Sequence, residues 1–546
     1  MSESMDTADH RRALEKVMAG RRVFAMLPSH TEARADYLVG LLKTAKARWG
    51  WQIDMLCQPA DRAAFRELAG PGGSLFTPPQ LLEPAAWEAD PERVAAVDRR
   101  LGEAEIVTRV ALGQIVLASQ GSIGQAFMTS ACRLNPTPLS QRVLRDNTEP
   151  FRIARRLFQS ADEMIEASAP DLLLAYEWEK PWRSTIWMAA TYRGIPCIAI
   201  RRSKLNPDHY FWTTDRVLFN VAARERAIAK RKSGAPVSDV AKERIRDFRQ
   251  QPTTIKYVDE KWRQVSKKSW LKWHVKWGRA VAAHLLAILT FRGAEQPKSF
   301  FARLVRYNHR AILAKRHPRF LHSFDDAALA AMAYIYFPMH KENDLPLIFQ
   351  APRWHDQRNT VQSLAAALPS GYRLLVREHR LNIGDRPTRY YRELSQLPNV
   401  VLIDAFESQF KYVRNADLVV TENGSSGWEG LLLGRRVLTL SRTYYDGAGL
   451  ARKVDDPDQV GATVLEALAA PAVLDQPEHD RGLGAMIDAE RETTFPMDGS
   501  GMQDVLDRLA DAVGAALPQH RPVAAAEAGE PREGAKRVAS PMSRQD

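Results

Sequence analysis

The chain has 546 residues, 45% of them hydrophobic, which is enough to bury the cores of two or three domains. Its cysteines, Cys57, Cys132 and Cys197, lie far apart, which excludes a disulfide framework and fits a reducing compartment. The net charge of +12 indicates an acidic partner, of which anionic lipid, anionic glycan, nucleotide and nucleic acid are the candidates.

Residues 1–20 are polar and mixed in charge, so they predict a flexible leader rather than a signal peptide. No later apolar run reaches the roughly 18 residues that a membrane-spanning helix needs. We therefore expect a cytoplasmic protein, at most peripheral on the inner face of the plasma membrane.

Residues 21–250 alternate short β-rich runs with helical stretches, which predicts a Rossmann-like N-terminal domain. A mostly helical insertion is predicted at 84–167. The predicted strands are 23–27, 53–57, 172–175 and 197–200. Ligands of such sheets bind at the carboxyl ends of the strands, so polar residues just after a strand matter most.

Two residues of this domain are candidates for a general base that takes a proton from a substrate hydroxyl. Glu177 follows the strand 172–175 among aromatic residues, and His30 follows the first strand and competes for the same role. The alternative for Glu177 is an ordinary surface carboxylate. Arg201 and Arg202, after the strand 197–200, are candidates for binding an acidic acceptor glycan or are simply solvent-exposed.

Residues 251–329 form a basic, Trp-rich segment between the two α/β halves. Drawn as a helix, residues 261–291 place Trp270, Trp273 and Trp277 on one side and most lysines on the other. This pattern predicts a helix that lies on an anionic membrane surface. The alternative is a domain-bridging helix packed by its tryptophans.

Residues 330–516 return to α/β alternation and predict a second Rossmann-like domain, which would bind a nucleotide. The tail, 517–546, lacks periodicity and predicts disorder. The predicted strands are 334–337, 347–349, 373–376, 400–403, 418–421 and 437–440, and the predicted helices are 356–368, 388–396, 407–414 and 427–433. The fold class is thus α/β, with two parallel-sheet domains facing a central cleft and helical insertions.

Residues 415–440 read as strand, Gly/Ser turn, helix and strand. The turn, Glu422-Asn423-Gly424-Ser425-Ser426-Gly427, would present backbone N–H groups and serine hydroxyls to a phosphate at a helix N-terminus. Glu429, one turn further on, would accept hydrogen bonds from a ribose. The alternative is a turn without a ligand in which Ser425 caps the helix. Neither GxGxxG nor a Walker motif occurs here.

Further polar residues, most of them basic, follow other strands of the same predicted sheet. His340 follows 334–337, Arg377-Glu378-His379 follow 373–376, and Arg353 lies after the apolar run 347–349. Each taken singly is a solvated or capping residue. Because the strand ends meet at one edge of the sheet, the set together predicts an anion site.

The stretches IYFPMH, RLLVREHRLNIG and NADLVVTENGSSGWEGLLLGRRVLTL resemble the capsule polysaccharide synthesis family over residues 330–460. Glu378-His379 and the pattern from Gly427 to Gly434 carry the resemblance, and Arg380 stands where the family usually has proline. The resemblance implies a GT-B glycosyltransferase related to the Kdo transferases, which needs no metal or cofactor. Its donor would be a nucleotide-sugar, for which a CMP-linked sugar is a candidate, and its acceptor a glycan or lipid-linked glycan.

Two alternatives stay open within this resemblance. One is a polyol-phosphate transferase of the same fold, and the other is a non-catalytic scaffold that binds other capsule assembly proteins. Specific nucleic-acid binding has no support beyond the charge, because the chain has no RNP, helix-turn-helix or zinc motif.

Overall fold

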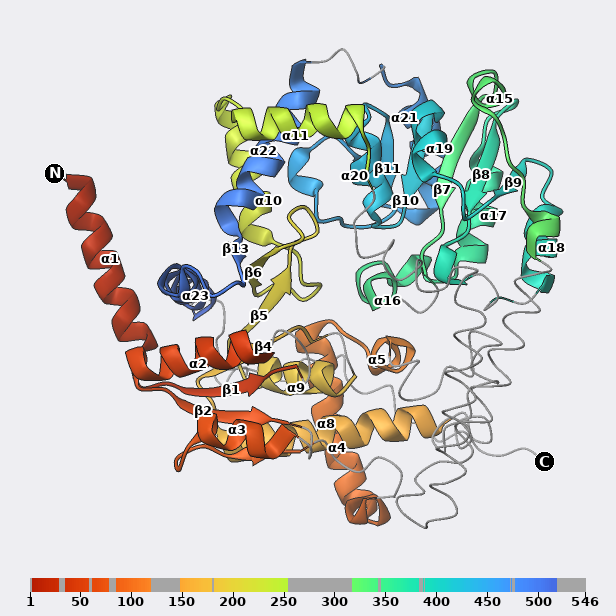
Figure 1. The fold of residues 1–546 in the computed structure, drawn as a ribbon. Helices are drawn as coiled ribbons and strands as arrows, with labels where there is room; N and C mark the ends of the chain where they lie inside the picture. Colours follow the sequence, from red (N-terminus) through yellow and green to blue (C-terminus); the bar gives the residue numbers. More distant parts are fainter. Residues whose placement is uncertain are drawn as a thin grey trace, which may run out of the picture.

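The computed structural model describes residues 2–28, 35–57, 61–77, 85–118, 148–178, 181–253, 317–341, 345–382, 386, 388–471, 473 and 477–517. They form two bodies, each built on a mainly parallel sheet covered by helices (Figure 1). The α/β fold class is confirmed.

The sheet of the N-terminal domain has the order β13-β6-β5-β4-β1-β2-β3. Strands β1 to β5 are parallel, while β6 is antiparallel to β5, and β13 is antiparallel to β6. The strands are β1 (Arg22–Met26), β2 (Gln52–Leu56), β3 (Leu75–Phe76), β4 (Leu172–Ala175), β5 (Cys197–Arg202), β6 (His209–Thr213) and β13 (Phe495–Pro496). Strands β3, β6 and β13 were not predicted from the sequence.

The sheet of the C-terminal domain has the order β12-β11-β10-β7-β8-β9, and all of its strands are parallel. Its inner strands are mainly apolar and buried, apart from the exposed Arg373 that begins β8, as expected of strands covered by helices on both faces. They are β7 (Tyr334–Pro338), β8 (Arg373–Arg377), β9 (Val400–Ile403), β10 (Leu418–Thr421), β11 (Val437–Thr439) and β12 (Arg452–Lys453).

The α-helices are α1 (Ser2–Met18), α2 (Ala35–Trp49), α3 (Arg62–Ala69), α4 (Pro91–Thr108), α5 (Leu112–Ala118), α8 (Glu149–Ser168), α9 (Pro181–Tyr192), α10 (Val221–Ser233), α11 (Asp239–Gln250), α15 (Asp326–Ala330), α16 (Leu345–Gln350), α17 (Gln357–Ala367), α18 (Thr388–Ser395), α19 (Gln409–Asn415), α20 (Ser425–Leu432), α21 (Val460–Ala469), α22 (Pro477–Thr493) and α23 (Met502–Ala516). Helices α4, α5 and α8 confirm the helical character of the described part of the insertion.

One predicted strand is wrong. Residues 347–349 lie in helix α16, where Leu347 and Ile348 are buried. Pro346 stands in the first turn of this helix, a position that proline favours because its missing N–H has no helical partner there. A short apolar run does not distinguish a buried helix from a buried strand.

The predicted flexible leader is also wrong, because residues 2–18 form helix α1. The indole of Trp51 donates to the carbonyl of Met18 at 2.7 Å, and that of Trp49 donates to Glu15 at 2.7 Å. Leu14 and Val17 pack against the N-terminal core. These tertiary contacts hold a helix whose own sequence is mostly polar.

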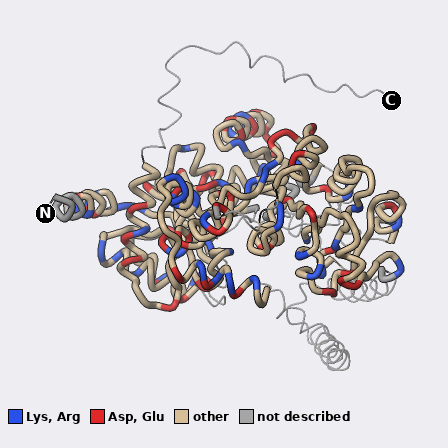
Figure 2. The backbone as a smooth tube through the Cα atoms, turned by 90° about the horizontal axis from the view of Figure 1, so that it is seen from above, with Lys and Arg blue, Asp and Glu red and all other residues tan. Residues whose placement is uncertain are grey.

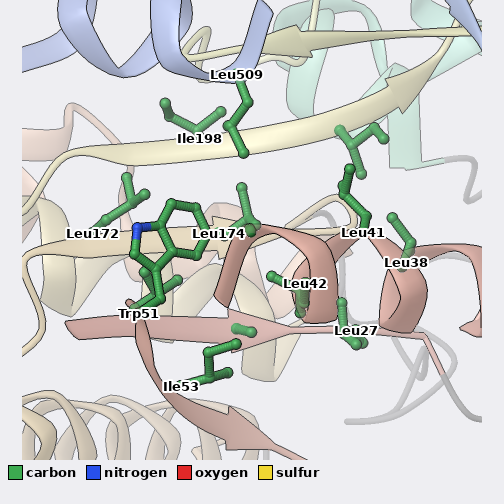
Figure 3. Packing of buried hydrophobic residues seen from close by; sticks show 14 of the residues in the cluster. Leu27, Leu38, Leu41, Leu42, Trp51, Ile53, Leu172, Leu174, Ile198 and Leu509 are labelled. Carbon is green, nitrogen blue, oxygen red and sulfur yellow. The ribbon is translucent and has the colours of Figure 1, made fainter. Parts of the chain in front are cut away.

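The chain crosses twice between the two cores. Helices α10 and α11 contribute Ala223, Ala227 and Ile245 to the core of the C-terminal domain. In return, α23 and β13 pack in the N-terminal core, where Leu509 lies over Ile198 of β5 (Figure 3). The boundaries predicted at residues 250 and 516 therefore do not separate the two cores.

This crossover predicts a large effect for a substitution far from the N-terminal domain in sequence. Leu509 is fully buried, so Leu509→Ala should cost about 2–5 kcal/mol of unfolding free energy in urea titrations. The matched control is Leu465→Ala on α21, because Leu465 is half exposed and should change stability by less than about 0.5 kcal/mol. Equal values for the two variants would show that α23 is not part of the core.

Some predictions fall outside the described residues. These are His30, the membrane-surface helix 261–291 and the disordered tail beyond Leu517. Among the described residues, the positively charged Lys and Arg are interspersed with the negatively charged Asp and Glu over both domains (Figure 2). None of the helices in the described ranges is both long and apolar enough to span a bilayer.

Candidate functional site

The C-terminal sheet has its topological switch point between β7 and β10. These strands are neighbours, but the chain continues from β7 toward β8 and from β10 toward β11, on opposite sides. Ligands of open α/β sheets bind in the crevice that such a divergence leaves at the carboxyl ends of the strands. His340 follows β7, and the Gly/Ser turn follows β10, so the structure brings these two predicted elements together.

The turn leads directly into α20, whose N-cap is Gly424 with no side chain to cap it. The first N–H groups of a helix have no intrahelical partner, so they are available to an anion at this end. A Cβ on Gly424 would lie 3.1 Å from His340 Nε2, and one on Gly427 would lie 1.9 Å from the hydroxyl of Tyr445. Both glycines therefore permit close packing at the start of the helix.

His340 and Glu422 form a buried pair beside this helix end, with Nε2 and Oε2 3.4 Å apart. Glu422 is fully buried, and among the described residues neither of its carboxyl oxygens has a hydrogen-bond partner. Burial raises the pKa of Glu422 to about 8. Burial, with the charges of Lys204 and His379, lowers the pKa of His340 to about 3. At neutral pH the contact thus joins two uncharged groups.

His379 lies in the same basic region. Burial lowers its pKa to about 4, and so do the charges of Arg377, Lys341, Arg386 and Arg380. A neutral imidazole donates one hydrogen bond without adding further positive charge. The cations that surround the two imidazoles favour binding of an anion at this edge of the sheet.

Glu429 lies inside the first turns of α20 and is 5% exposed. Gln409 Nε2 donates to its Oε2 at 2.6 Å. Burial raises the pKa of Glu429 to about 7, while a hydrogen bond from Ser425 and the charge of Arg377 oppose that rise. Its carboxyl group is thus held beside the turn and close to half protonation at neutral pH.

The part of the chain that contains this site is similar to a known protein family. Residues 291–460 match the sequence model of the family described as "Capsule polysaccharide biosynthesis protein". This segment, which is less than half of the chain, is similar to that family. It contains β7 to β11, α20 and every predicted donor-site residue. A search of curated proteins finds no match.

Several solved structures are similar to the chain at low identity. The β-Kdo 2,7 transferase of Thermosulfurimonas dismutans KpsC is 11% identical, over 64% of this chain and 88% of that one, with a TM-score of 0.29. The β-Kdo 2,4 transferase of the same protein is 12% identical, over 58% and 79%, with a TM-score of 0.30. The glycotransferase of kitacinnamycin is 15% identical, over 92% and 100%, with a TM-score of 0.23.

Glu378, in this capsule-family segment, is buried in a network of its own. Arg386 Nε lies 2.8 Å from Oε2, the Tyr391 hydroxyl donates to Oε2 at 2.9 Å, and Asn382 donates to Oε1 at 3.0 Å. This carboxylate therefore fixes the loop after β8. Asn423 is equally buried and donates to Gln350 Oε1 at 3.1 Å.

Arg377 and Arg353 have different surroundings. Arg377 is buried and donates through Nη2 to the carbonyls of Ala405 at 2.7 Å and Glu407 at 3.1 Å. Arg353 is 65% exposed and lies 3.9 Å from Asp458, so the structure does not bring it into the cluster around His340.

Arg380, which replaces the proline of the capsule family, holds the loop after β9. Its Nε donates to the carbonyl of Ala405 at 2.8 Å, and Nη2 donates to those of Phe406 and Glu407 at 3.4 Å. Hydrogen bonds to this neighbouring loop therefore supply a restraint where the family has the rigid ring of proline.

In the N-terminal domain, Glu177 lies just after β4, at the switch point between β4 and β1. Its backbone is left-handed, with φ of 61°, a conformation that costs a non-glycine residue free energy and often marks a functional position. Arg201 Nη1 donates to Oε2 at 2.5 Å, and Arg183 Nη1 lies 3.7 Å from Oε1. Trp182 is stacked under the Arg183 guanidinium.

Lys204, Gln409 and Gln350 were not predicted from the sequence as residues of the site. Gln350 Nε2 donates to the carbonyl of Val217 at 2.8 Å and so links the Gly/Ser turn to the N-terminal domain. Gln409 and Gln350 lie on two short helices, without a strand-end position or a motif, and Lys204 lies on the loop after β5. The only signal for Lys204 was its place shortly after the predicted strand 197–200.

Proposed function

We propose that the chain is a glycosyltransferase that moves a sugar from a nucleotide-sugar donor to a growing capsular or surface polysaccharide. The uncapped start of α20 at the switch point, beside two uncharged histidines in a basic region, carries this proposal. Such an end of a helix suits a phosphate, and the leaving group of a nucleotide-sugar is a phosphate. The similarity of residues 291–460 to the capsule family supports a polysaccharide as the product.

In this proposal the C-terminal domain stabilises the charge that develops on the leaving phosphate. The N–H groups of Ser425, Ser426 and Gly427 would donate to its oxygens, and His340 and His379 would add neutral donors. Glu429 would hold the ribose. The bond from the anomeric carbon to the phosphate oxygen breaks as the acceptor oxygen bonds to that carbon.

The acceptor hydroxyl must lose a proton in this step. We assign it to the carboxylate of Glu177, which would accept the hydroxyl hydrogen bond and take the proton as the new glycosidic bond forms. Arg201 and Arg183 hold that carboxylate in place at the end of β4. His30 remains the second candidate for this role.

The proposal is tested with a panel of CMP-, UDP- and GDP-linked sugars and purified acceptor glycan, by measuring transfer and donor hydrolysis. His379→Ala should lower kcat/KM about 100-fold because it removes one donor to the leaving phosphate. Glu429→Ala should raise KM by removing the ribose contact. Turnover should persist in EDTA, since the assigned groups replace a metal ion.

The matched control is Arg389→Ala on α18, because Arg389 is 84% exposed and pairs only with Glu393 among the described residues. It should keep wild-type kinetics. Unchanged turnover in His379→Ala and Glu429→Ala would overturn the site assignment. A phosphodiester product would identify a polyol-phosphate transferase, and nucleotide binding without turnover would identify a scaffold.

A further inference from the structure

The N-terminal domain places a lysine against the candidate donor site. Lys204 lies on the loop between β5 and β6, and its Nζ stands 5.1 Å from the ring centroid of Tyr444. The hairpin of β5 and β6 extends toward the C-terminal domain (Figure 1). Tyr444 follows β11 and is therefore a residue of the other domain.

Tyr444 connects this lysine to the Gly/Ser turn. Its ring meets that of Tyr445 edge to face at 4.9 Å, and the Tyr445 hydroxyl donates to the carbonyl of Gly424 at 3.3 Å. The charge of Lys204 is also close enough to lower the pKa of His340. Lys204 thus contacts Tyr444, which follows β11, and acts electrostatically on His340, which follows β7.

The backbone that carries Lys204 is fixed by a buried carboxyl group. Ser203 Oγ contacts Glu490 Oε1 at 2.5 Å, and Asn220 Nδ2 donates to Glu490 Oε2 at 3.0 Å. Glu490 lies on α22, which packs in the C-terminal core, and Asn220 caps α10. The loop is therefore held to elements that pack in the C-terminal core, which reduces the entropy lost when the lysine binds a ligand.

We propose that Lys204 is a phosphate-binding residue for the nucleotide donor, supplied by the N-terminal domain to a site otherwise built by the C-terminal domain. This inference rests on the proposed function. An ammonium group above an aromatic ring, beside uncharged imidazoles and a helix N-terminus, adds the mobile point charge that a phosphate binds well.

The test measures affinities by isothermal titration calorimetry for CMP, UDP and GDP and for the matching nucleosides, cytidine, uridine and guanosine. In Lys204→Met the affinity for the nucleotide that binds wild type should fall at least about tenfold, because a charge-assisted hydrogen bond is lost. The affinity for the matching nucleoside should stay within about twofold, because it has no phosphate. Lys204→Arg should restore most of the nucleotide affinity.

The matched control is Lys242→Met on α11, because Lys242 is 62% exposed and pairs with Asp239. It should bind the nucleotide like wild type. If Lys204→Met keeps the wild-type ratio of nucleotide to nucleoside affinity, Lys204 makes only a structural contact between the domains. The inference is then overturned. If wild type itself binds no nucleotide, the proposed function falls and the role of Lys204 with it.

Discussion

Gly427→Ala should abolish most of the activity, although alanine is the better helix former. A Cβ at this position would lie 1.9 Å from the Tyr445 hydroxyl and 2.9 Å from Thr421 Cγ2. Tyr445 is buried and its hydroxyl donates to Gly424, so its displacement moves the start of α20. We expect a loss of about 1–3 kcal/mol in unfolding free energy from overpacking. Turnover should fall about 100-fold because the phosphate donors are misplaced.

A second substitution tests this explanation directly. Tyr445→Phe removes the hydroxyl, so the double variant Gly427→Ala/Tyr445→Phe should recover part of the lost stability. Recovery is partial because Tyr445 Cζ and Thr421 Cγ2 remain within 2.9 Å. Gly40→Ala on α2 is the control, since a Cβ there meets nothing within 4 Å and should stabilise the helix by about 1 kcal/mol. A double variant no more stable than Gly427→Ala would contradict the proposed clash.

Glu422→Gln should make the protein less sensitive to alkaline pH. The ordinary pKa of glutamate is 4.5, and burial raises that of Glu422 to about 8 in the folded state. Between these values the folded chain binds the proton that the unfolded chain has lost, so wild-type stability falls as pH rises. The slope is about 1.4 kcal/mol per pH unit for one proton. Glutamine fills the same space without titrating.

Between pH 6.5 and pH 8, the contribution of Glu422 to the pH dependence of the unfolding free energy can be measured separately from that of His340. Below the ordinary histidine pKa of 6.5, His340 has the opposite slope, because its pKa is lowered to about 3 and the unfolded chain binds the extra proton. As the pH rises across that window, the unfolding free energy of wild type should fall by about 2 kcal/mol relative to that of Glu422→Gln in urea titrations. Glu478→Gln, at an exposed position on α22, should run parallel to wild type. Parallel curves for all three proteins would exclude a buried, protonated Glu422.

Much of the second domain follows from its sequence. Strands β9 and β10 lie at the predicted residues, because an unbroken apolar run between turn residues is typical of a buried parallel strand. The Gly/Ser turn and α20 were also predicted, since a glycine-rich turn after a buried strand of an α/β sheet usually leads into a helix. His340 and the turn were expected at one sheet edge, and the switch point between β7 and β10 places them there.

Other elements and contacts of the protein could be determined only from the tertiary structure. The helix at Leu347, the ordering of α1 and the packing of α23 in the N-terminal core each depend on contacts with segments distant in sequence. The same holds for Glu378, saturated by its own network, and for Lys204, which reaches Tyr444 from the other domain. Local periodicity encodes which face of an element is apolar, but which distant surface covers that face is a property of the whole folded chain.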